Sequence, residues 1–257
     1  MANFGSSLAH SPRILLISFR EGQSLSRHMT ETKDQNTRVP IIIGTLGLTS
    51  AILGVRWFYK SYLKRIPNNA SIPSRFFHTR SILGRVIAVG DGDNFRLYHT
   101  PGGYLAGWGW LRKVPKVNTR GISSTTINIR LCGIDAPEAA HFGKPAQPYS
   151  KEALEWLRNY VLGRRVRVTL LANDQYGRTV GDAYVWKLTG RRNVSKEMLR
   201  NGLAVVYEGK TGAEFNGMEE QLRKLEKQAR AKRKGQFAGR KRVQTPGEYK
   251  RLYKIQQ

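Results

Sequence analysis

The stretch Arg130–Glu138 constrains the fold of this chain most strongly, because it places one arginine and two carboxylates within nine residues. The run Thr126–Leu131 leads into it with alternating apolar and polar side chains, which is typical of a β-strand with one buried face. A proline closes the stretch. A strand that carries Arg130 therefore delivers Asp135 and Glu138 to the loop at its exit.

Two further charged segments are expected to lie beside this loop. Asp91–Asp93 forms a turn between two strand-like runs upstream, and Asp174–Arg178 forms a second turn downstream. We predict that the three segments form one site that cleaves a phosphodiester bond. Such cleavage requires positive charge on the phosphoryl oxygens, an oriented water molecule and a base for that water.

The charged residues of these segments divide by chemistry. Asp93 and Asp135 offer hard oxygen ligands suited to Ca²⁺ or Mg²⁺. Glu138 is the candidate base for the water, and Arg130 and Arg178 are permanently charged forks that match phosphate geometry. Each segment alone is weak evidence, because Asp-Gly-Asp is usually only a turn and a surface arginine is usually solvated. The prediction depends on the combination.

Residues 101–124 are rich in glycine, tryptophan and lysine and are predicted to form an excursion from the domain. Aromatic side chains interleaved with basic ones could stack on and clamp a nucleic-acid strand. They could equally pack onto the domain surface. On the first interpretation Trp108 and Lys116 bind the substrate, together with Tyr176 of the downstream turn.

The charge balance favours a polyanionic partner. Forty-four lysines and arginines against eighteen acidic residues give a formal net charge of +26. Such an excess attracts nucleic acid or anionic lipid, although basic tails can also serve only solubility or targeting. The single cysteine, Cys132, excludes an intrachain disulfide.

An uncharged segment precedes the charged motifs. Residues 39–55 contain no charged side chain, and the aromatic residues that follow extend the apolar character to residue 59. This length is typical of a membrane-spanning helix, and its glycines would weaken the alternative, a buried core helix. We predict a single-pass anchor over 39–59. The basic, Ser-rich tail 1–38 is typical of a mitochondrial targeting segment, or else is a disordered tail.

The remaining chain is predicted to hold a linker (60–80), a globular domain (81–239) and a basic tail (240–257). Alternating strand-like segments in the domain are followed by three segments with helical spacing. These are residues 149–162, 194–201 and 217–234. Short strands, tight turns and interspersed helices predict a small closed barrel with helices packed on it.

Residues 81–239 resemble the staphylococcal nuclease-like (thermonuclease) family. The matching segments are Val89–Asp93, Arg130–Glu138, Asp174–Arg178 and Leu199–Ala204. With the predicted anchor, this resemblance implies a mainly β fold with α-helices. It comprises an OB-fold-like five-stranded β-barrel with about three packed helices, preceded by a single N-terminal transmembrane helix.

The resemblance also implies an activity, a Ca²⁺-dependent endonuclease that cuts DNA and RNA. Asp93 and Asp135 would hold Ca²⁺, Glu138 would act as general base, and Arg130 and Arg178 would stabilise the phosphoryl group. The anchor and the insertion make the chain similar to the membrane-anchored fungal branch of this family, whose members are described as probable mitochondrial endonucleases.

Two other functions stay open. One is a non-catalytic barrel, anchored to a membrane, that binds nucleic acid or protein. The other is a lipid-surface protein whose basic helix at 217–234 contacts anionic headgroups. The chain departs from the family pattern at Asn94 and Ala136, where threonine is common, but neither change removes a charged group. The intact set of carboxylates and arginines favours an enzyme.

Overall fold

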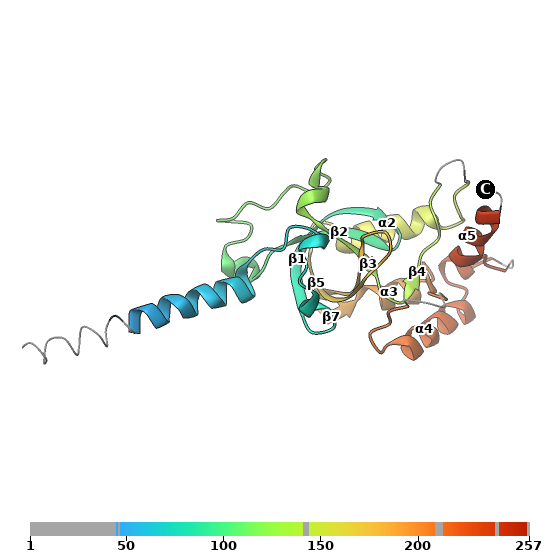
Figure 1. Cartoon of the computed structure of the whole chain (residues 1–257). Coiled ribbons are helices and arrows are strands. Elements are labelled where there is room, and N and C mark those ends of the chain that lie inside the picture. The colour runs from blue at the N-terminus through green and yellow to red at the C-terminus, as the bar shows by residue number, and fades with distance from the viewer. Residues whose placement is uncertain (1–44, 46, 141–143, 209–212, 240–241, 256–257) are drawn as a thin grey trace, which may run out of the picture. The chain divides into compact units, whose positions relative to one another are not determined.

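The computed structural model describes residues 45, 47–140, 144–208, 213–239 and 242–255 (Figure 1). The chain divides into two compact units, Met1–Ser61 and Tyr62–Gln257.

The first unit contains an α-helix over residues 47–58, which continues into a π-helical turn at Tyr59–Leu63. Its large apolar side chains, such as Ile52 and Trp57, are exposed. Within the described residues, no helix combines the length and apolar character that crossing a membrane requires. Residues 39–44 and 46 of the predicted anchor lie outside the described residues, as does the whole predicted tail, so the anchor stays a prediction.

The second unit is built on a closed ring of five β-strands (Figure 1). The strand order is β3-β2-β1-β5-β6-β7, and a parallel pairing of β3 with β6 closes the ring, with β7 attached outside it. The strands are β1 Ser81–Asp91, β2 Asn94–His99, β3 Ile127–Leu131, β5 Arg165–Asn173, β6 Thr179–Lys187 and β7 Gly190–Asn193. The predicted OB-like barrel is confirmed, with one additional strand.

Strand β1 bends around the ring, because it pairs with β2 along one part and with β5 along another. Its register with β2 shifts between Val86 and Ala88 and again before Asp91. Such bulges increase the bend and twist of a strand. Buried positions alternate along β2 and β3, so that Phe95 and Ile129 fill the barrel with no exposed surface.

Four α-helices and a small second sheet pack around the ring. The helices are α2 Ser150–Val161, α3 Val194–Arg200, α4 Glu219–Ala231 and α5 Pro246–Ile255, and the sheet pairs β4 Ile134–Asp135 with β8 Val205–Val206. The first three helices were predicted. Helix α5 was not, because 240–257 was assigned to a basic tail.

A reciprocal cap begins α5. The backbone N–H of Glu248 donates to Thr245 Oγ1 at 3.2 Å, and the backbone N–H of Thr245 donates to Glu248 Oε2 at 3.0 Å. Threonine followed three positions later by glutamate is a capping box, and a proline at the first helical position strengthens it. The basic residues around this pattern led to the prediction of a tail here instead of a helix.

Part of the predicted linker 60–80 is integral to the barrel. Ile66 is buried, and Asn69 bonds to two strands. The Asn69 side chain donates to the carbonyl of Asn128 and to Thr179 Oγ1, and accepts from the backbone N–H of Asn128, each at 2.8 Å. Asn128 lies on β3 and Thr179 on β6, so Asn69 joins the strands that close the ring. The prolines and asparagines of 60–80 are typical of a linker, which is why the segment was predicted to be one. The long-range bonds of Asn69 leave no pattern in the sequence.

We expect Asn69→Ala to lower the free energy of unfolding by about 1–3 kcal/mol, because it leaves partly buried backbone groups of Asn128 without partners. Urea denaturation of the full chain measures this loss. The matched control is Asn159→Ala on the exposed face of α2, which should change stability by about 0.5 kcal/mol or less. Equal small losses in both variants would contradict the role given to Asn69.

His99 at the end of β2 is a buried neutral histidine. Its Nδ1 accepts the backbone N–H of Ile66 at 2.9 Å. Burial, assisted by the nearby Arg65 guanidinium, lowers the pKa of His99 to about 4. In the unfolded chain the pKa is about 6.5. Between these values the unfolded chain binds a proton that the folded chain does not, so this group costs stability as the pH falls through that window.

We therefore expect His99 to account for a loss of about 2 kcal/mol of unfolding free energy between pH 7.5 and pH 5. His99→Asn keeps an acceptor for Ile66 but does not titrate, so its stability should fall less over the same range. Urea denaturation at both pH values separates this difference from the titration of the carboxylates, which the two proteins share. Parallel pH dependences would show that His99 is not held neutral.

Candidate active site

The site is organised around Arg130 on β3. Its Nε donates to Asp93 Oδ2 at 3.2 Å, and its Nη2 donates to Asp135 Oδ1 at 3.0 Å. The guanidinium also stacks over the ring of Tyr207, 4.9 Å from its centroid. One arginine thus bridges two carboxylates that lie forty-two positions apart in the chain. The sequence predicted these residues to share one site but assigned Arg130 to the phosphoryl group, not to the carboxylates.

The β-ladder places Asp93. Asn94 pairs with Arg130 across β2 and β3, and the carbonyl of Asp93 accepts the backbone N–H of Leu131 at 2.9 Å. The predicted hairpin therefore ends directly against β3. Asp93 is only 7% exposed, so it reaches Arg130 without a layer of solvent between them.

The turn after β3 places Asp135 and Glu138. Gly133 adopts a left-handed conformation with φ of 70°, and an added Cβ would lie 2.5 Å from a methyl of Leu222. Glycine is therefore required both by the backbone and by the packing of α4. Further on, the side chain of Gln147 accepts the backbone N–H of Glu138 at 2.8 Å, which fixes the start of the following loop.

Helix α5 contributes a residue that the sequence analysis missed. Lys250 Nζ lies 2.7 Å from Glu138 Oε1 and 3.4 Å from each carboxylate oxygen of Asp135. Tyr249 holds the helix in place, since its buried side chain donates from the hydroxyl to the carbonyl of Pro145. Only the capping box in the sequence indicated a helix here, and nothing in the sequence indicated its position against the site.

The pKa values show how closely these charges are packed. Burial raises the pKa of Asp135 to about 6, because it outweighs the opposing effect of the Lys250 and Arg130 charges; Asp93 and Glu138 add to the rise. Burial opposes the charge of Lys250, but Asp135 and Glu138 outweigh burial and raise the pKa of Lys250. Burial and Asp93 likewise raise the pKa of Asp91. Negative charge is therefore concentrated here, and additional positive charge would be stabilised.

This donor set fits a hard divalent cation. Asp93 and Asp135 present only oxygen atoms, are almost fully buried and share one guanidinium. Ca²⁺ and Mg²⁺ both prefer carboxylate oxygen and complete their shells with water or substrate oxygen. Among the described residues, no group of three or more acidic, histidine or cysteine side chains is arranged to hold a metal.

Arg178 lies in the predicted turn before β6, which pairs with β3 through Thr179 and Ile129. Its Nε donates to Asp174 Oδ2 at 2.6 Å, and Asp174 Oδ1 also accepts the backbone N–H groups of the turn at Tyr176 and Arg178. The Tyr176 ring is 73% exposed and lies 5.4 Å from the Arg178 guanidinium. The turn thus presents an aromatic face to solvent beside a cation.

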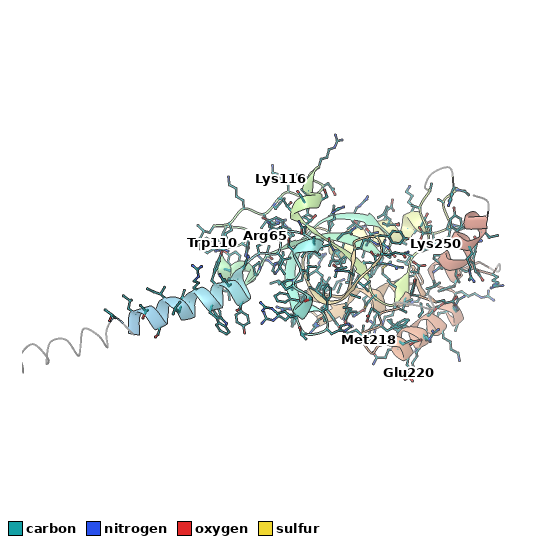
Figure 2. The ribbon with its side chains drawn as sticks, in the orientation of Figure 1. Arg65, Trp110, Lys116, Met218, Glu220 and Lys250 are labelled. Atoms are coloured by element: carbon teal, nitrogen blue, oxygen red, sulfur yellow. The ribbon has the colours of Figure 1, made fainter. Side chains whose placement is uncertain are left out.

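The structure does not bring Trp108 or Lys116 to the carboxylates. Trp108 is buried within the insertion, where its indole N–H donates to the carbonyl of Pro101 at 2.9 Å. Trp110 and Lys116 lie at the opposite end of the second unit from Lys250 (Figure 2). Trp108 therefore follows the second interpretation of the insertion, in which its aromatic side chains pack onto the domain surface.

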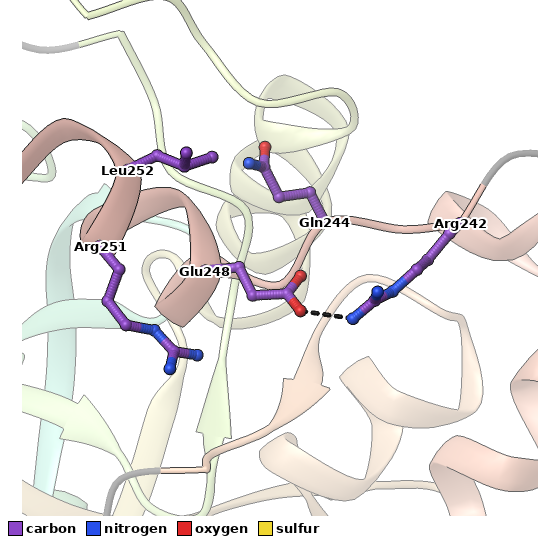
Figure 3. Close-up of a pocket in the computed structure, with 5 residues that line it drawn as sticks. All are labelled: Arg242, Gln244, Glu248, Arg251 and Leu252. Carbon is purple, nitrogen blue, oxygen red and sulfur yellow. Dashed lines mark hydrogen bonds and ion pairs between the residues drawn. The ribbon is translucent and has the colours of Figure 1, made fainter.

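A pocket of about 360 Å³ opens beside α5 (Figure 3). It is lined by Arg242, Gln244, Glu248, Arg251 and Leu252. Arg242 pairs with Glu248 across it at 2.6 Å. Of its two basic side chains, Arg251 lies on the helix that carries Lys250, and Arg242 precedes that helix.

The chain is similar to known proteins over most of its length. A family described as "Staphylococcal nuclease homologue" matches residues 128–238. A protein of Yarrowia lipolytica named "Probable endonuclease LCL3" is 54% identical over 82% of this chain and 93% of its own length. Proteins of the same name from Komagataella phaffii and Candida albicans are each 51% identical over 83% of this chain, covering 94% and 91% of their own lengths.

The chain belongs to the staphylococcal nuclease family.

In this staphylococcal nuclease homologue, the matched residues 128–238 include Arg130, Asp135, Glu138 and Arg178. Asp93 comes before the matched segment, and Lys250 after it. The fold therefore completes the site from both sides of that segment.

We expect Lys250→Met to increase the affinity for Ca²⁺ roughly three- to tenfold, because an ammonium that shares carboxylate oxygens with a cation competes with it. Isothermal titration calorimetry on the full chain measures the affinity. Lys224→Met on the exposed face of α4 removes the same charge elsewhere and should leave the affinity nearly unchanged. Weaker Ca²⁺ binding by Lys250→Met would mean that the lysine supports the site.

Proposed function

We propose that this chain is an endonuclease that hydrolyses phosphodiester bonds of DNA or RNA with the help of Ca²⁺. The bridging of Asp93 and Asp135 by Arg130, with Glu138 in the same cluster, carries the proposal. Membership of the nuclease family and the names of the fungal relatives support it. The formal charge of +26 favours a nucleic-acid substrate.

Each charged group has a separate task in the proposed reaction. Glu138 orients the attacking water and accepts its proton, which requires the carboxylate to leave its contact with Lys250. Arg130 and Arg178 bind the phosphoryl oxygens through their planar forks. Ca²⁺ held by Asp93 and Asp135 would supply charge that stabilises the phosphoryl group as negative charge grows on it.

Tyr176 is the proposed contact for a nucleobase. Its exposed ring can stack on a base, because every base has an aromatic face, and the adjacent Arg178 can bind the backbone of the same strand. Asp174 holds this arginine in place before substrate binds. A substrate phosphate would then exchange one anionic partner of Arg178 for another.

We also propose that the chain is tethered to a membrane through a single helix over 39–59, in a mitochondrion. The uncharged sequence of 39–55 supports a spanning helix. The exposed apolar side chains on the described helix at 47–58 agree with a lipid environment. The basic, Ser-rich tail supports mitochondrial targeting.

We expect Glu138→Gln to reduce the rate of DNA cleavage by the full chain roughly 10²–10⁴-fold, because a positioned general base contributes about this much. The melting temperature should change little. Glu155→Gln, on the exposed face of α2, is the matched control and should retain activity. Excess chelator should stop cleavage by the wild-type protein.

The outcomes separate the parts of the proposal. Full activity of Glu138→Gln would exclude this residue as the base, and full activity in chelator would exclude the cation. A folded wild-type protein that binds DNA and RNA but cleaves neither would support the alternative, a non-catalytic binding barrel.

A further inference from the structure

Large apolar side chains stand exposed on the insertion at the end of the barrel that is remote from Lys250 (Figure 2). We call them the insertion patch: Tyr104, Leu105, Trp110 and Leu111, which are 58%, 96%, 63% and 71% exposed. Single exposed apolar residues are common, but a local group of this size marks an interaction surface. The patch plays no part in the proposed chemistry.

The insertion patch is held outward by a built scaffold. Buried Trp108 anchors the insertion through its bond to the carbonyl of Pro101 and by packing its ring edge-on against Tyr98, 5.9 Å between centroids. On the outer side, the indole N–H of Trp110 donates to the carbonyl of Tyr104 at 2.9 Å. The two outer rings lie 6.1 Å apart and are tilted to each other. The aromatic part of the patch is thus formed before any partner binds.

The charged residues of the insertion have one sign. The chain has no acidic residue between Asp93 and Asp135, while the insertion carries four basic ones, Arg112, Lys113, Lys116 and Arg120. Such a surface is complementary to a polyanion. Tryptophan and tyrosine favour the membrane–water interface, leucine favours hydrocarbon, and nearby lysine and arginine are attracted to anionic headgroups.

We propose that the insertion patch docks onto an anionic lipid surface, with its two aromatic rings at headgroup level and its two leucines in the acyl boundary. Nucleic acid is the other polyanion, but Leu105 and Leu111 can neither stack on bases nor bind phosphate. Leu63, which begins the second unit beside Tyr62, packs against Gly102 of the insertion. The inference rests on the proposed tether, which would bring the same lipid surface to this end of the barrel.

The test places a fluorophore on the patch of the full chain. Cys132 is buried and stays unlabelled, so Leu105→Cys can carry an NBD label alone. Leu252→Cys on α5 is the matched control, since it also replaces an exposed leucine. The protein is reconstituted into vesicles of phosphatidylcholine and phosphatidylglycerol in equal parts that contain nitroxide lipids. Flotation of the same sample measures membrane association independently.

We expect nitroxide lipids to quench the label at position 105 at least about threefold more than the label at 252, as interfacial insertion requires. Lys113→Glu with Lys116→Glu should reduce quenching at 105 while the chain still floats. Unchanged quenching in that double variant would overturn the assignment to anionic lipid.

Flotation with equal quenching at both positions would overturn the docking surface and leave the tether standing. A chain that does not float would overturn both. Shielding of the label at 105 by an oligonucleotide without vesicles would overturn the lipid assignment in favour of nucleic acid. Nuclease activity is a separate measurement, and its absence would bear only on the proposed reaction.

Discussion

The structure depends on one partly buried arginine that lies in the strand closing the barrel. Arg130 occupies β3, which pairs with β2 on one side and β6 on the other. The first pairing brings the Asp93 turn to its guanidinium, and the second brings the segment after Arg178 alongside. Removing one partner of such a buried ion pair leaves an uncompensated charge, typically at a cost of about 3–5 kcal/mol. The strand pairings that close the ring are therefore the same pairings that bring the site residues together.

Helix α5 links the end of the chain to this cluster. Lys250 shares Asp135 with Arg130, so that two cations and three carboxylates contact one another in a confined space. Lys250 is half-exposed, whereas Arg130 is largely buried. The lysine can therefore exchange its carboxylate partners for water more readily than Arg130 can. The proposed cation and Lys250 then compete for the same oxygens, which would couple the position of α5 to the state of the site.

The second unit has two dissimilar ends. Acidic side chains gather with Arg130 and Lys250 at one end, while the insertion patch and its basic neighbours occupy the other (Figure 2). In the proposed arrangement one end faces lipid and the other receives nucleic acid. Asn69 and the β3–β6 pairing close the barrel that lies between them.

The sequence by itself determined the five strands of the ring, the helices α2, α3 and α4, and the hairpin that presents Asp93, because their periodicity and turn residues are local properties. It also indicated that the strand carrying Arg130 delivers Asp135 and Glu138 to its exit, since the three lie within nine residues. Only the tertiary structure decided that Asn69 belongs to the barrel, that Trp108 is packed and that Lys250 reaches Glu138. Each of these depends on contacts between segments far apart in the chain. Local sequence patterns do not predict which distant segments come into contact in the folded barrel.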